Sequence, residues 1–402
     1  MRTAADLDAA DPLAAFAARF VPAEGVVAYL DGNSLGRPVA ATARRVDEFL
    51  RRDWGSRLIR SWDEQWLDAP FALGDRIAAL TLGAAAGQTI VADSTTVLLY
   101  KLARAAVTLR EGRDEVVVDS DNFPTDRFVL EGIAAERGLT LRWITPDPAL
   151  GVTPEQVAEV VGERTALVVL SHVAYRSGYV ADVPAITALA HRAGALVLWD
   201  LCHSAGVLPV SLDAWGVDLA VGCTYKYLNG GPGAPAFAYV REGLQGSLTQ
   251  PIQGWMGAAD VFAMGPGYRP GPGMRSFLSG TPPIVGMLPV RDMLDLIEEA
   301  GVVAIRAKSV ALTAFVVEWA ESRLFDLGVR VVGPRDPERR GGHVTLAHPA
   351  MRDVTAALWE RGVIPDFRFP DGLRIGLSPL STTFAEVEAG LEAVREELRA
   401  RS

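Results

Sequence analysis

Lysine is scarce in this chain, and the lysine amine is the side-chain group that bonds covalently to aldehydes. Among 39 lysine and arginine residues there are three lysines, Lys101, Lys226 and Lys308. Lys226 follows an apolar run at residues 219–221, so it is predicted to stand just beyond a buried strand. Lys101 and Lys308 lie inside helical patterns and are predicted to be solvated or to extend along the surface toward water. Lys226 is therefore the candidate for amine chemistry.

Asp200 is the second candidate, because it ends another apolar run, residues 195–199, and lies 26 positions before Lys226. His203 follows three positions later. An aspartate that caps a helix beginning near Leu201 is the alternative interpretation of Asp200 alone. Together with Lys226, the carboxylate favours another function. Pyridoxal phosphate (PLP) needs an amine for its aldehyde and a carboxylate that keeps its pyridine nitrogen protonated. The ends of adjacent strands can present both groups to one ring.

Two further features fit the rest of that cofactor. Thr95 and Thr96 begin a helical pattern, and hydroxyls with backbone amides at a helix N-terminus bind phosphate. A simple helix cap explains the same two residues. Phe123 follows the apolar run at 116–118 and is a candidate platform on which a flat ring could stack, although packing explains it equally. Neither feature indicates a cofactor without Lys226 and Asp200.

The elements that must position these residues are short apolar runs that alternate with helical stretches up to about residue 240. Continuous apolar strands separated by helices are typical of a mainly parallel sheet covered on both faces. Such α/β sheets bind ligands at the carboxyl ends of their strands. The clearest runs are residues 116–118, 141–144, 166–170, 195–199 and 236–240.

The segments on either side of this region follow other patterns. The first twenty residues predict a helix with an apolar stripe of Leu13, Phe16 and Phe20. Residues 250–285 are rich in glycine and proline, and a long amphipathic helix is predicted from about 284 to 319. A smaller α+β segment follows, with strands near 329–332, 343–346 and 373–377, before a charged closing helix.

Composition excludes several classes of function. The formal net charge of −10 argues against a nucleic-acid-binding protein, which would carry a basic face. Hydrophobic residues make up 49%, yet no apolar run approaches the length of a membrane span, and acids interrupt the N-terminus before a signal peptide could form. The two cysteines, Cys202 and Cys223, match no metal motif and are predicted to be small buried hydrophobic residues. A cytoplasmic protein is therefore predicted.

Four motifs together resemble the kynureninase family of fold type I (aspartate-aminotransferase-like) PLP enzymes. The resemblance runs in register from Tyr29 to Pro379, and its motifs are YLDGNSLG at 29–36, FPTD at 123–126, DLCHSAG at 200–206 and YKYLNGGPG at 225–233. It implies a large domain, residues 46–285, with a mainly parallel sheet of the seven-stranded type between helices. It also implies a small α+β domain with its linking helix, residues 286–402, and an N-terminal segment, 1–45, associated with that small domain.

The resemblance implies a role for each site residue that binds the cofactor. Lys226 would form the Schiff base with PLP, Asp200 would pair with the pyridinium nitrogen, and Tyr225 would bond the phosphate and take part in proton transfer. The other cofactor contacts implied are Thr95 and Thr96 at the phosphate, Phe123 stacked on the ring with Asp126 close by, and Ser171 and His203 beside the cofactor.

Substrate and partner contacts are implied in the same way. Arg374 would bind the α-carboxylate of the substrate with two parallel hydrogen bonds. Trp255 and Thr281 would reach the phosphate from the neighbouring subunit of a homodimer. The family reaction is hydrolysis of L-kynurenine, or its 3-hydroxy form, to anthranilate and L-alanine by cleavage of the Cβ–Cγ bond. That reaction belongs to the kynurenine pathway of tryptophan catabolism and NAD biosynthesis.

Three positions depart from the family pattern or vary within it. Leu98 stands where relatives carry Asn, Ala174 stands where a polar amide is common, and some members carry Asn in place of Thr281. Three alternatives also stay open. A cysteine desulfurase needs a nucleophilic cysteine downstream of the Schiff-base lysine, whereas both cysteines here precede Lys226. An aminotransferase shares the early steps, and a non-catalytic PLP-binding protein would keep the fold.

Overall fold

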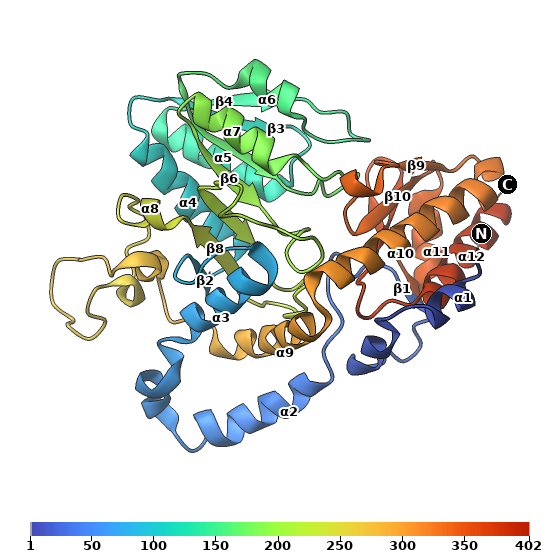
Figure 1. Ribbon diagram of the computed structural model, residues 1–402, viewed down its shortest axis with the longest axis horizontal. Helices are drawn as coiled ribbons and strands as arrows, with labels where there is room; N and C mark the ends of the chain where they lie inside the picture. The colour runs from blue at the N-terminus through green and yellow to red at the C-terminus, as the bar shows by residue number, and fades with distance from the viewer. Residues whose placement is uncertain (1, 402) are drawn as a thin grey trace.

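The computed structural model describes residues 2–401 and has two lobes, joined by a long helix (Figure 1). The larger lobe is built on a seven-stranded sheet in the order β2-β8-β7-β6-β5-β3-β4. β8 is antiparallel to both of its neighbours, and the remaining pairs are parallel. Its strands are β2 (Thr89–Ala92), β3 (Glu115–Asp119), β4 (Thr140–Ile144), β5 (Thr165–Ser171), β6 (Leu196–Asp200), β7 (Leu219–Gly222) and β8 (Ala236–Val240). The mainly parallel sheet predicted from the apolar runs is confirmed.

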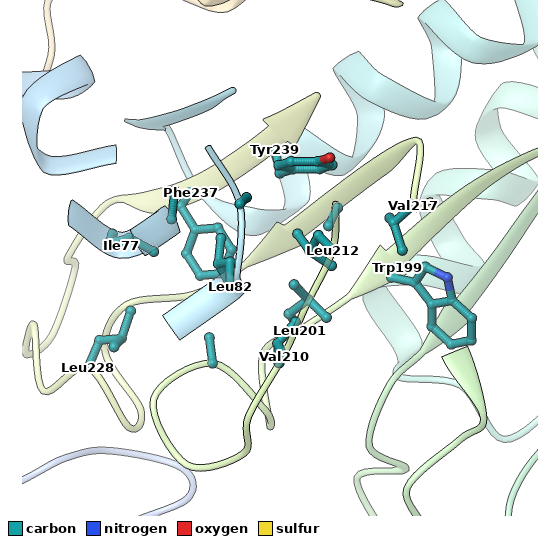
Figure 2. Close-up of a cluster of buried hydrophobic side chains, with 14 of the residues drawn as sticks. Ile77, Leu82, Trp199, Leu201, Val210, Leu212, Val217, Leu228, Phe237 and Tyr239 are labelled. Carbon is teal, nitrogen blue, oxygen red and sulfur yellow. The ribbon is translucent and has the colours of Figure 1, made fainter. Parts of the chain in front are cut away.

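Helices cover both faces of this sheet, because the central strands are apolar on both sides. Along β5, Leu167 and Val169 pack on one face while Val168 and Leu170 pack on the other. One face carries α4 (Thr95–Leu109) and α5 (Pro124–Arg137). The other carries α3 (Ala69–Ile77), α6 (Pro154–Val160), α7 (Val183–Arg192) and α9 (Ile284–Ala300). Figure 2 shows part of this second face, where Phe237 of β8 lies beside Ile77 and Leu82.

The smaller lobe is an antiparallel sheet in the order β12-β13-β10-β9, with helices packed on it. Its elements are α10 (Val302–Arg323), β9 (Arg330–Val332), β10 (His343–Ala347), α11 (Met351–Glu360), β11 (Val363–Ile364), β12 (Asp366–Arg368), β13 (Gly372–Gly376) and α12 (Phe384–Arg399). The α+β segment predicted here is confirmed. The N-terminal strand β1 (Ala28–Tyr29) pairs with β11, and Ala28 and Leu30 share the core of this lobe. The division of the chain at residues 45 and 285 stays a prediction.

Three predicted helices differ from the structure. The long helix expected over 284–319 is two helices, α9 and α10, which meet at 88° because Gly301 adopts φ +77°, a conformation that ends an α-helix. The first twenty residues form the short helix α1 (Ala4–Ala9) and a 3₁₀ segment, Ala14–Arg19, with a break between them. Residues 201–206 are turns, so the helix considered after Asp200 does not form.

The remaining helices are α2 (Ala41–Glu48), continued by the π-helical turn η2 (Phe49–Trp54), and α8 (Glu242–Gln245). After α8, residues 246–283 form a long loop that projects from the large lobe at the left of Figure 1. Within residues 2–401 no single helix has the length and hydropathy of a membrane span, although α9 and α10 taken together pass that test across their bend.

Candidate active site

The two principal candidates lie at neighbouring strand ends. Asp200 ends β6 and stands opposite Val221 of β7, and the chain leaving β7 turns back within a few residues to Lys226. Both side chains are buried, and both line the same pocket. The full lining is Thr95, Thr96, Phe123, Thr125, Asp126, Ser171, Tyr175, Asp200, Cys202, His203, Tyr225 and Lys226. The structure therefore brings together nine of the predicted site residues.

Lys226 is held without a carboxylate partner. Its Nζ lies 3.1 Å from Nε2 of His203 and 5.8 Å from the ring centres of Phe123 and Tyr225. In the described part of the chain, residues 2–401, no Asp or Glu oxygen lies within ion-pair distance of this amine. Burial, followed by the positive charge of Lys226, lowers the pKa of His203 well below its ordinary value, so that imidazole is neutral. The amine thus faces a neutral base and two aromatic rings.

The other two lysines are not solvated, which corrects the sequence prediction. Lys101 is 0% exposed, and its Nζ lies 2.5 Å from Asp93 and donates to the carbonyl of Phe277. Lys308 is also buried, and its Nζ lies 2.7 Å from Asp11. A buried ammonium needs such a counter-charge, and each lysine has one.

A helix N-terminus opens into one end of the pocket. Ser94 caps α4 by accepting a hydrogen bond from the amide of Val97, and Thr95 and Thr96 begin the helix at the pocket wall. The 15-residue helix directs its unpaired amides and the positive end of its dipole at this point. This end of the pocket suits an anion such as phosphate.

The two aspartates of the pocket, Asp200 and Asp126, differ in their surroundings. Asp200 accepts a hydrogen bond of 2.7 Å from the amide of Cys202. Burial, with the neighbouring Asp200 and Asp119 carboxylates, raises the pKa of Asp126 well above its ordinary range, so Asp126 is a neutral acid in the pocket. Burial also raises the pKa of Tyr225, which therefore keeps its phenolic proton.

Arg374 is a buried residue of the small lobe. It is 1% exposed, and its guanidinium donates to the carbonyl of Tyr175, the hydroxyl of Ser34 and the carboxylate of Asp366. Most of its donors are therefore engaged within the protein, and an incoming carboxylate would have to exchange with Asp366.

The turn at 31–36 connects Arg374 with the lysine loop. Ser34 accepts from Arg374, while the amide of Gly36 donates to the carbonyl of Tyr225 at 2.9 Å. A Cβ atom on Gly36 would lie 2.4 Å from the carbonyl oxygen of Lys226, so only glycine fits this contact. The turn explains why a motif near the N-terminus belongs to the site.

Three predicted residues do not line the pocket within this chain, namely Arg374 of the small lobe, Trp255 and Thr281. Trp255 is 43% exposed and belongs to the projecting loop, as does Thr281. The two positions that depart from the family pattern are placed differently. Leu98 is a residue of α4 and is buried in the hydrophobic core. Ala174 lines a small pocket next to the site.

Sequence reasoning missed three residues that line the pocket, Thr125, Tyr175 and Cys202. Thr125 and Cys202 lie inside recognised motifs, which would have been enough to include them. Tyr175 stands in the loop after β5 and meets Phe123 edge to face at 5.5 Å, a contact that no periodicity indicates. A larger pocket, with an empty volume of about 850 Å³, lies between η2 and α9 but includes none of the predicted site residues. The described residues contain no cluster of three metal-ligating side chains.

Comparison with known proteins identifies the family. Residues 305–394 match the model of the kynureninase C-terminal domain, and residues 70–234 match that of the Cys/Met metabolism PLP-dependent enzymes. A kynureninase from Pseudomonas fluorescens is 43% identical over 398 residues, which are 97% of this chain and 93% of that protein. The chain belongs to the kynureninase family. Another member, from Burkholderia pseudomallei (strain K96243), is 42% identical over the same shares of both chains. The predicted family and its dependence on PLP are confirmed.

Solved structures similar to this member of the kynureninase family confirm its fold. The cysteine desulfurase of Thermococcus onnurineus NA1 superposes with a TM-score of 0.81 at 20% identity, covering 100% of this chain and 99% of its own. The cysteine desulfurase CsdA of Escherichia coli gives 0.80 at 19% identity, covering 96% and 98%. At such identities the likeness concerns the fold alone. It is the fold type I arrangement predicted from the sequence.

Proposed function

We propose that this protein hydrolyses L-kynurenine to anthranilate and L-alanine, with 3-hydroxy-L-kynurenine as a second candidate substrate. The proposal rests on membership of the kynureninase family and on one observation. A buried lysine without a carboxylate partner shares a pocket with a strand-end aspartate, and a buried arginine lies across the junction of the lobes. In the balanced reaction, one water is consumed and the Cβ–Cγ bond is cleaved.

The residues present fit PLP in charge and placement. Lys226 would carry the aldehyde carbon, Asp200 would face the pyridine nitrogen, and Phe123 would lie against the ring. Thr95 and Thr96, with the amides that begin α4, would hold the phosphate. When bound, the cofactor supplies an electron sink for the bonds to the substrate α-carbon.

The protein's own groups perform the remaining work. The amine of Lys226, once free, removes the proton from the α-carbon. Its neighbour His203 is neutral and therefore places no second positive charge beside this amine. Asp200, whose carboxylate accepts from the amide of Cys202, would face the cofactor from the end of β6. Tyr225 retains its phenolic proton and can donate it in the later steps. Arg374 binds the α-carboxylate in exchange for Asp366.

The direct test is incubation of the purified protein with L-kynurenine. Anthranilate fluorescence should appear together with an equal amount of L-alanine. Incubation with L-cysteine serves as the second arm, because Cys202 and Cys223 are buried and precede Lys226. Release of sulfide from cysteine without anthranilate formation would assign the chain to desulfurase chemistry instead.

We also propose that the active unit is a cytoplasmic homodimer in which Trp255 and Thr281 enter the partner's site. The exposure of Trp255 and the projection of its loop away from the lobe support this (Figure 1). Mixing inactive Lys226→Ala and Trp255→Ala proteins and allowing exchange should restore activity, since one site of each mixed dimer is then intact. No recovery, with exchange verified by mass spectrometry, would contradict the shared site.

A further inference from the structure

Three polar side chains beside Lys226 are buried with atoms that have no hydrogen-bond partner. They are His203, His343 and Tyr227, which are 6%, 0% and 3% exposed. Nδ1 of His203, both ring nitrogens of His343 and the hydroxyl of Tyr227 are unpartnered. Buried polar atoms are ordinarily paired, so a cluster of this kind is expected to have a function. His343 belongs to none of the four motifs that carried the family resemblance.

His343 occupies the junction between the lobes. It begins β10 and pairs with Gly376, so its side chain lies on the same face of the small sheet as Thr345 and Arg374. That face meets the large lobe, where the hydroxyl of Thr345 donates to the carbonyl of Arg176. The His343 ring centre is 5.4 Å from that of His203, with the planes tilted by 56°. His343 is therefore the small lobe's contact with the histidine beside Lys226.

The contact between Lys226 and His203 requires one tautomer. A lysine amine that donates this hydrogen bond makes Nε2 of His203 the acceptor, at 3.1 Å. A neutral imidazole then carries its proton on Nδ1, which has no partner of its own. A buried N–H donor of this kind needs an acceptor.

His343 can supply that acceptor. Burial, then the charges of Arg374 and Lys226, lower the pKa of His343 well below its ordinary value, so its ring is neutral with one free lone pair. The backbone of Tyr175 acts in the opposite direction and raises that pKa against the other effects. A small ring rotation or one buried water would join the two histidines.

We infer that His343 is a positioning residue that acts through His203, holding it in the Nδ1–H tautomer so that Nε2 accepts from Lys226. The hydrogen-bond direction then runs from Lys226 to His203 and from His203 to His343. This orients the amine each time it is released from the cofactor. The inference rests on the proposed role of Lys226, and it adds a residue of the small lobe to that role.

Imidazole ¹⁵N NMR tests the inference, because the chain has five histidines and the tautomer of each is directly visible. The protein is loaded with pyridoxamine 5′-phosphate, whose amine cannot bond to Lys226, so the lysine stays free without any substrate. His203 should show Nδ1–H with Nε2 as acceptor. His343→Phe should shift it to Nε2–H or to a mixture, whereas His343→Gln, whose amide both accepts and donates, should preserve it.

Kinetics supply the second readout. With L-kynurenine, His343→Phe should lower kcat on the order of tenfold while leaving KM within about twofold, and His343→Gln should recover most of the loss. An Nε2–H tautomer of His203 in the unmodified protein would overturn the inference even if the Phe variant fails to fold. An unchanged tautomer in folded His343→Phe would overturn it as well. Neither NMR result depends on kynurenine turnover, so failure of the proposed function would be seen separately.

Discussion

The surroundings of Lys226 and those of the other two lysines differ in one respect. All three side chains are buried. Lys101 is paired with Asp93 and Lys308 with Asp11, whereas Lys226 faces a neutral histidine and two aromatic rings. A carboxylate at ion-pair distance holds a buried amine in place. An amine without one is free to approach an aldehyde and bond to it. The absence of a counter-charge, and not burial, distinguishes Lys226 from the other two lysines.

Among the replacements that test this comparison, that of Lys226 should have the largest effect on activity. Lys226→Ala removes both the attachment point and the base, so kcat with L-kynurenine should fall by at least about 10³-fold. Lys101→Met serves as the matched control, because it removes an equally buried amine outside the pocket. Its activity per folded molecule should stay within a few-fold of the original. Loss of activity in the control with Lys226→Ala still active would reverse the assignment of the two lysines.

Asp200→Asn should have the next largest effect. The amide keeps the size of the side chain and can still accept from the Cys202 amide. It cannot keep a pyridine nitrogen protonated, so activity should drop by more than about 100-fold while cofactor absorbance is retained. The neutral neighbour Asp126 provides the control, since Asp126→Asn preserves its uncharged state and should cost less. Near-normal turnover of Asp200→Asn would place the required carboxylate elsewhere.

Arg374→Ala should act on substrate and not on cofactor. Loss of a buried guanidinium contact to the α-carboxylate corresponds to about 2–5 kcal/mol, seen as a raised KM with an unchanged cofactor spectrum. Arg374→Lys should recover part of this, because a point charge cannot make the two-pronged contact. Asp366→Asn sharpens the test: it removes the internal carboxylate that competes for Arg374 and should lower KM. An unchanged KM in Arg374→Ala would show that Arg374 does not bind the α-carboxylate and would make Arg368 the next candidate.

Lys308→Met should affect stability and leave chemistry unchanged. It leaves Asp11 buried without its partner, which should lower the free energy of unfolding by about 3 kcal/mol. The double replacement Lys308→Met with Asp11→Leu should regain most of this, because a buried ion pair can be exchanged for apolar packing. Denaturant unfolding measures both, and kcat per folded molecule should be unchanged. Equal stability of the single variant and the original would show that the pair contributes nothing.

The sequence predicted the large sheet well, because most of its strands are continuous apolar runs that need no long-range information. The pocket residues that lie at strand ends or in motifs were predicted, and Asp200, Lys226 and Phe123 are examples. The counter-charges of Lys101 and Lys308 were not predictable, since a helical pattern does not reveal that a lysine faces the core. Asp11 is also far from Lys308 in the sequence, and only the folded structure places the two side chains together.

Two other features depended on tertiary structure. The break at Gly301 was missed because apolar periodicity continues across it, and one glycine within a helical pattern is often tolerated. His343 was missed because it begins an ordinary buried strand, and its neighbourhood arises only where the two lobes meet. Residues that act across such a junction are the ones that strand periodicity cannot indicate.

Reduction of the PLP-loaded protein with borohydride, followed by peptide mapping, tests the central claim most directly. The reagent fixes the cofactor to whichever amine holds it, and mass spectrometry then locates the pyridoxyl group among the three lysines. The label should be found on Lys226, with none on Lys101 or Lys308, whose amines are held by Asp93 and Asp11. A pyridoxyl group on either of those two lysines would contradict the account.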